Sequence, residues 1–111
     1  MPLLKSFLLE ERKMATRTPI PVRRAQREIA SNLSLARRQQ RVTVELLADR
    51  AGISVPTLRR LLNEGVGSLE NYLRVANILG LLEGAVKATD PLNTPMGRLR
   101  ADEDTPQRVR R

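Results

Sequence analysis

The sequence contains no cysteine and no histidine, and these two absences exclude many kinds of chemistry. The chain has no disulfides, no thiolate nucleophile, none of the usual zinc ligands and no imidazole to act as a general base near neutral pH. The remaining residues show no nucleophile–base pair and no glycine loop that would cradle a phosphate. We therefore expect no enzyme, no metal site and no cofactor, and the lack of cysteine fits a reducing cytoplasm.

Aromatic residues and long apolar runs are also scarce. Phe7 and Tyr72 are the only aromatic side chains, too few for the stacking platforms that bind single-stranded nucleic acid. No run of about 18 apolar residues occurs, so we expect no membrane span. A length of 111 residues predicts one small domain with extensions.

Positive charge, in contrast, is abundant. Lys and Arg number 20 against 12 Asp and Glu, which gives a net charge of +8. Such a chain suits a polyanionic partner, either nucleic acid or an acidic protein surface. Charge alone does not distinguish these two partners.

Helical periodicity is evident from residue 23 onward. Ile29, Leu33 and Ala36 recur at i, i+4 and i+7, which predicts a first helix over about 23–40. Residues 1–22 contain a short apolar stretch, a charged run and the phrase TPIP, and we expect an N-terminal extension there, either unstructured or a short docking helix. From residue 90 to 111 the sequence is polar and dotted with prolines, which predicts a flexible C-terminal tail.

Capping residues predict the boundaries of three more helices, and a further helix is expected to follow them over 81–88. Thr43, Ser54 and Ser68 each stand where an N-cap belongs, and Pro56 is tolerated in a first turn because no intrahelical N–H is needed there. Glycines end the segments that follow the caps. The predicted helices, with their caps, cover residues 43–52, 54–65, 68–80 and 81–88.

The second and third predicted helices are separated only by a short turn around Gly52 and Ile53. Two helices joined in this way must cross steeply, which is the geometry of a helix-turn-helix. On a helical wheel the third helix has an apolar side for the core and an opposite side for solvent. The inner residues are Leu58, Leu61 and Leu62; the outer ones are Pro56, Arg60 and Asn63, with Arg59 on the flank.

The outward arginines favour DNA binding. An α-helix fits the major groove of B-DNA, where Arg can bond bidentately to guanine, and Ser or Thr near the helix N-terminus can meet phosphates or base edges. An isolated Arg-Arg pair is more often an ordinary solvated face. Here the cap, the glycine turn and the outward placement coincide, so DNA binding is the stronger interpretation.

Residues 27–81 resemble a Cro/cI-type (XRE) helix-turn-helix domain, on the strength of LADRAGIS, TLRRL and SLENYLRVANILGL. The resemblance implies an all-α, five-short-helix, lambda-repressor-like fold over residues 23–89. It also implies a third helix in the major groove and a homodimer on pseudo-palindromic double-stranded DNA. Base edges would be met by Val55, Pro56 and Arg60, and phosphates or flanking positions by Thr43, Thr57, Arg59 and Asn63, with Ser54 at the helix N-terminus.

Val55 and Pro56 depart from the family pattern, which often has polar residues at these positions. Readout here would lean on Arg59 and Arg60, with apolar contact to thymine methyl groups. The same two residues favour a rival hypothesis. In that hypothesis the chain is a protein-interaction module that keeps the helix-turn-helix fold without specific DNA binding.

Leu62 is a second departure from the pattern. Many members of the family have at this position a Glu that pairs with an Arg of the first helix. The corresponding Arg37 would therefore either face DNA or bond to a nearby acid such as Glu64.

Residues 79–111 resemble the C-terminal extension of HipB-like antitoxins, which are operon-mates of HipA-type Ser/Thr kinase toxins. The match rests on the DP element at 90 and 91, the PMGR phrase and the terminal QRVRR. It implies an antitoxin that represses its own operon and binds a kinase, whereas the plain alternative is a basic disordered tail. Within this region Leu81, Leu82 and Val86 would either complete the small core or form a dimer surface.

Overall fold

The computed structural model describes residues 17–101 and residue 103. Every regular element among these residues is a helix, so the predicted all-α class is confirmed. None of the described helices is long and apolar enough to cross a bilayer. The elements are α2 (Ile20–Gln39), α3 (Val44–Ala51), α4 (Val55–Glu64), α5 (Leu69–Leu79), α6 (Leu82–Ala88), the 3₁₀ helix η1 (Pro91–Asn93) and α7 (Pro95–Leu99).

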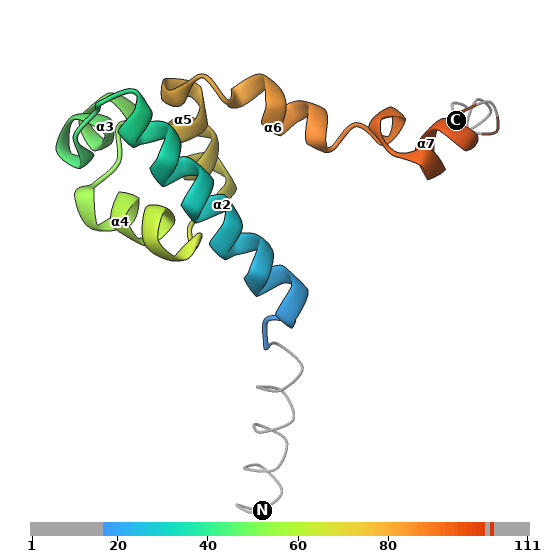
Figure 1. Ribbon diagram of the computed structural model, residues 1–111, viewed down its shortest axis with the longest axis horizontal. Helices are drawn as coiled ribbons and strands as arrows, with labels where there is room; N and C mark the ends of the chain where they lie inside the picture. Colours follow the sequence, from blue (N-terminus) through green and yellow to red (C-terminus); the bar gives the residue numbers. More distant parts are fainter. Residues whose placement is uncertain (1–16, 102, 104–111) are drawn as a thin grey trace, which may run out of the picture.

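Helices α2 to α5 form a bundle around one small apolar core (Figure 1). Helix α4 packs on α2, α3 packs on α5, and α3 and α4 also contact each other. The three leucines predicted for the inner side of α4 are all buried. The core consists of Leu33, Leu47, Ala48, Ala51, Leu58, Leu61, Leu62, Val75 and Leu79.

The predicted caps are present in the structure. The side chains of Thr43, Ser54 and Ser68 accept hydrogen bonds from backbone N–H groups three residues later, at 3.1, 3.2 and 3.0 Å. These bonds satisfy donors that have no partner within the helix. The three helices α3, α4 and α5 then end at glycines in the left-handed conformation, which are Gly52, Gly65 and Gly80.

Helix α2 begins at Ile20, three residues earlier than predicted. Pro19 is its N-cap, with φ −61° and ψ 149°, and a second proline lies in the first turn. Neither proline disrupts the helix, because the first turn uses no intrahelical N–H. The phrase TPIP therefore starts the helix instead of preceding it, and the apolar stretch of residues 3–9 lies outside the described residues.

The buried side of α2 also differs from the prediction. Ile29 was expected in the core but is 40% exposed, whereas Ala30 and Leu33 are each 2% exposed. Leu33 and Ala36 do pack in or against the core as predicted. The residues of α2 that are not exposed are Gln26, Ala30, Leu33, Ser34, Ala36 and Arg37, so half of them are polar. Apolar periodicity alone could not identify a stripe of that composition.

Helices α6, η1 and α7 leave the bundle in a row that we call the arm (Figure 1). Helix α6 contacts α5, and α7 contacts η1. No residue of these three helices is buried. The flexible tail predicted from residue 90 instead begins with two short helices, because Asp90 and Thr94 each cap a turn that a proline starts.

Candidate nucleic-acid interface

The turn between α3 and α4 consists of Gly52, Ile53 and Ser54. Gly52 has φ 72° and ψ 35°, which lets the chain reverse direction directly after Ala51. Ile53 donates its backbone N–H to the carbonyl of Ala48 at 3.0 Å, and its side chain packs against the core. The turn is thus held by both a hydrogen bond and apolar contact, and it fixes the start of α4.

The outer face of α4 is arranged as the helical wheel predicted. Pro56, Arg60 and Asn63 are all exposed. Val55 is half-buried and packs against the core, so it offers less surface to a base edge than the resemblance implied. Among the described residues, no carboxylate lies within 4.0 Å of Arg60.

One hydroxyl group near the start of each of the helices α3 and α4 keeps a hydrogen to donate to an outside partner. Ser54 Oγ accepts the backbone N–H of Thr57 and donates to Thr57 Oγ1 at 2.7 Å. Thr57 Oγ1 therefore acts as an acceptor, which leaves its own hydrogen for an outside oxygen. The same holds for Thr43, whose Oγ1 accepts the N–H of Leu46.

Arg59, on the flank of α4, pairs with Glu45 of α3. Its Nη2 lies 3.5 Å from Glu45 Oε2, and the two side chains are 54% and 69% exposed. A pair this exposed contributes about 0 to 1 kcal/mol, so a phosphate can replace the carboxylate at little cost. The contact places Arg59 beside the N-terminal turn of α3, near Thr43.

Arg37 does not form the ion pair with Glu64 that was one of its two predicted roles. Its Nη1 donates to the carbonyl oxygen of Val42 at 2.8 Å, in the link between α2 and α3. Its Nε is buried without a hydrogen-bond partner among the described residues. The guanidinium thus fixes the residue that precedes the Thr43 cap. The predicted bond to Glu64 is wrong, and contact with DNA stays a prediction.

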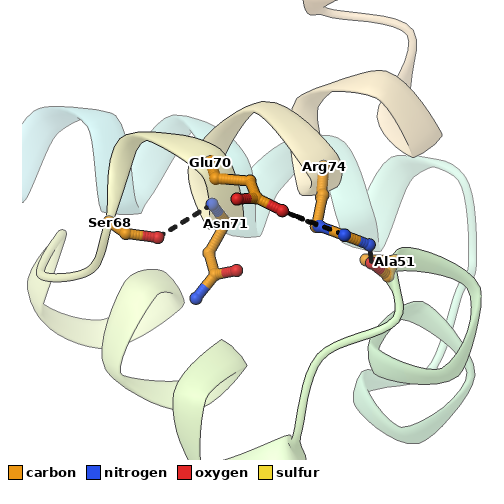
Figure 2. Close-up of polar contacts among 5 residues, drawn as sticks. All are labelled: Ala51, Ser68, Glu70, Asn71 and Arg74. Atoms are coloured by element: carbon orange, nitrogen blue, oxygen red, sulfur yellow. Dashed lines mark hydrogen bonds and ion pairs between the residues drawn. The ribbon is translucent and has the colours of Figure 1, made fainter.

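Two residues that position the turn were not identified from the sequence, and Figure 2 shows them. Arg74 of α5 donates from Nη1 to the carbonyl of Ala51 at 3.2 Å and from Nε to Glu70 Oε2 at 3.0 Å. Ala51 is the last residue of α3, so this contact ties the beginning of the turn to α5. The i, i+4 spacing of Glu70 and Arg74 was the available signal, but it did not reveal the bond to Ala51.

The C-terminal end of α4 is held against α2. Ser34 Oγ donates to the carbonyl of Leu62 at 2.9 Å. Gly65, with φ 70°, lies so close to Gln26 that any side chain there would overlap the Gln26 backbone carbonyl. Both ends of α4 are therefore fixed, the first by the turn and the second by α2.

Comparisons of the chain with protein-family models, with curated proteins and with solved structures each gave no match. What the interface can bind is therefore inferred from its own residues alone. It presents one helix, fixed at both ends, with an exposed arginine in the middle of its outer face and hydroxyl donors near its start. This arrangement can place a guanidinium in a groove while the hydroxyls meet flanking anions.

Proposed function

We propose that this protein is a sequence-specific repressor that binds double-stranded DNA through α4. The proposal includes a lambda-repressor-like arrangement of the bundle and membership of the XRE type. The observation that carries it is Arg60, which is exposed, has no carboxylate nearby among the described residues and lies in the middle of a helix fixed at both ends. A helix of this kind is what major-groove recognition requires.

In the proposed complex, the residues divide into two groups. Arg60 bonds to guanine, with Pro56 and the exposed part of Val55 beside thymine methyl groups. The hydroxyls of Thr43 and Thr57 donate to phosphates, and Arg59 exchanges Glu45 for a phosphate. The first group reads the sequence, while the second fixes the register of the helix on the duplex. Ser54 caps the N-terminus of α4, and Asn63 flanks the site.

We further propose that the repressor is a two-fold homodimer whose two α4 helices lie about 34 Å apart in successive major grooves. The support comes from α6. Leu81 is 39% exposed and Val86 is 62% exposed, and no residue of α6 is buried. These side chains do not complete the core of their own chain, so contact with a second copy is the favoured role.

The proposed setting is an antitoxin in a reducing cytoplasm that represses its own operon and binds a HipA-type kinase. The support is the HipB-like resemblance of residues 79–111, together with the surface of the arm. Leu92, Met96 and Leu99 are 53%, 57% and 75% exposed. A chain of short helices with outward apolar side chains suits a protein partner.

The rival function is a protein-interaction module that does not bind specific DNA. Two observations favour it, the half-burial of Val55 and the pairing of Arg59 with Glu45. Salt dependence separates the two functions, because each neutralised phosphate changes the slope of log affinity against log salt by about −0.9. A repressor with several phosphate contacts gives a steep slope, whereas a mixed protein interface responds weakly.

The decisive experiment selects a preferred site from random duplexes with the full-length chain and then measures affinity by fluorescence anisotropy. Arg60→Ala should lose about 1 to 3 kcal/mol on the preferred site and relax base choice at one position. Arg100→Ala is the matched control, because it removes the same charge from the arm. If no site is enriched and the salt slope is shallow, the interaction module is the better description.

A further inference from the structure

A cleft of about 260 Å³ lies between the N-terminal half of α2 and the C-terminal end of α4. With the exception of Asn63, none of its residues was predicted to contact DNA. The cleft differs from the outer face of α4 because two helices build it. Its walls are formed by Arg23, Gln26, Arg27, Asn63, Glu64 and Val66.

The charges around the cleft favour an anion. Arg23 and Arg27 are one helical turn apart, and two like charges at this spacing destabilise a helix by about 0.2 to 0.5 kcal/mol. The first turn of α2 contains no acidic residue, so no carboxylate of that turn offsets the two guanidinium charges. Glu64 also lines the cleft, but no ion pair of 4.0 Å or less joins it to either arginine.

The cleft is also well fixed in shape. Gly65 brings the end of α4 against the backbone of Gln26, which lies on α2 between the two arginines. The hydrogen bond from Ser34 to Leu62 holds the last turn of α4 about two helical turns further along α2. The helix backbones that carry the two arginines and the end of α4 are therefore fixed relative to one another.

Asn63 joins the cleft to the interface described above. It lines the cleft and it also belongs to the exposed outer face of α4. When α4 lies in a major groove, which is about 12 Å wide, the sugar–phosphate backbones border it on both sides. An anion site at the end of the helix is then beside one of these backbones.

We infer that Arg23 and Arg27 together bind one backbone phosphate of duplex DNA, at the edge of the groove that α4 reads. This inference rests on the proposed function, because it takes α4 as the helix in the groove. Guanidinium groups bind phosphate oxygens in a bidentate manner, and two of them suit a single phosphate. The contact carries no base information, so it contributes affinity and register for every sequence.

The test compares the full-length chain with Arg23→Ala/Arg27→Ala. Affinity is measured by anisotropy on the selected site and on a scrambled duplex, from about 50 to about 300 mM salt. The double variant should bind both duplexes about 10- to 100-fold more weakly, and its salt slope should be shallower by about 0.9. Preference between the two duplexes should stay unchanged.

The matched control is Arg24→Ala/Arg100→Ala, which removes the same charge from positions that do not line the cleft. It should keep the wild-type slope. An unchanged slope in Arg23→Ala/Arg27→Ala, beside a steep wild-type slope, would overturn the phosphate site and leave the proposed function intact. A changed preference between duplexes would also overturn it, since the arginines would then read bases. A wild-type chain with no salt-dependent DNA binding would remove both proposals.

Discussion

The bundle of α2 to α5 and the arm of α6, η1 and α7 use the same kinds of local signals but differ in what their side chains touch. Both have capped helices that begin near proline or hydroxyl residues. In the bundle the apolar side chains meet one another, and Leu47, Leu58 and Val75 are fully buried. In the arm no residue is buried. Local signals thus form helices in both regions, while apolar side chains are buried between helices only in the bundle.

The largest contrast in stability between the two regions should come from replacing one leucine in each by alanine. Leu58→Ala should lower the free energy of unfolding by about 2 to 5 kcal/mol, because it leaves a cavity in a packed core. Leu99→Ala should change it by no more than about 0.5 kcal/mol, since its side chain is 75% exposed. Urea unfolding followed by circular dichroism measures both. Equal effects would show that the arm packs as firmly as the bundle.

A smaller effect is expected at the junction of α4 with α2. Gly65→Ala should destabilise the chain by about 2 kcal/mol or more, through the left-handed backbone and through overlap with Gln26. Gly80→Ala is the control, because Gly80 has φ 78° but open space around it. It should lose about 1 to 2 kcal/mol from the backbone alone. Identical losses in thermal or chemical unfolding would mean that the close approach to α2 contributes nothing.

Next in size is the contact of α5 with the turn. Arg74→Met should lower the free energy of unfolding by about 1 kcal/mol, because the Ala51 carbonyl and Glu70 both lose a charged donor. Lys87→Met tests the corresponding pair in the arm, where Lys87 and Glu83 lie 3.4 Å apart and are strongly exposed. It should change stability by less than about 0.5 kcal/mol. A greater loss of stability from Lys87→Met than from Arg74→Met would contradict the stabilising role given to Arg74.

The smallest effect on stability should follow removal of residues 90–111. The truncated chain should melt within about 4 °C of the full chain, because the removed residues include no buried one among those described. If the proposed function is right, operator affinity should stay within a few-fold, whereas co-purification of the proposed HipA-type kinase should be lost. Equal recovery of both forms would exclude the tail as the docking segment.

The parts of the molecule that could be predicted from sequence are those whose cause is local. Thr43, Ser54 and Ser68 cap helices because each bonds to an N–H three residues away, and that spacing is visible in the chain. The leucines of α4 could be placed because a regular helix has a fixed period. These signals identified the turn and the exposed face of the candidate interface.

The rest depends on contacts between residues far apart in the chain. Ala30 is buried in place of Ile29 because α4 determines which side of α2 faces inward. The bond from Arg74 to Ala51 spans 23 positions, and its acceptor is a backbone carbonyl that no residue type reveals. The cleft could not be found either, since it requires the ends of two helices to meet at Gly65.

Helix α5 gives the arm a mechanical connection to the interface. Its Arg74 holds the last carbonyl of α3, and its C-terminal end continues through Gly80 into α6. A protein that displaces the arm therefore acts on the same helix that fixes the start of α4. If the protein binds both DNA and a partner at the arm, as proposed, these two ligands should change each other's affinity by the same factor, as linkage demands. Titrating the partner onto the chain with and without operator DNA measures that factor, and a value of one would show that α5 transmits nothing.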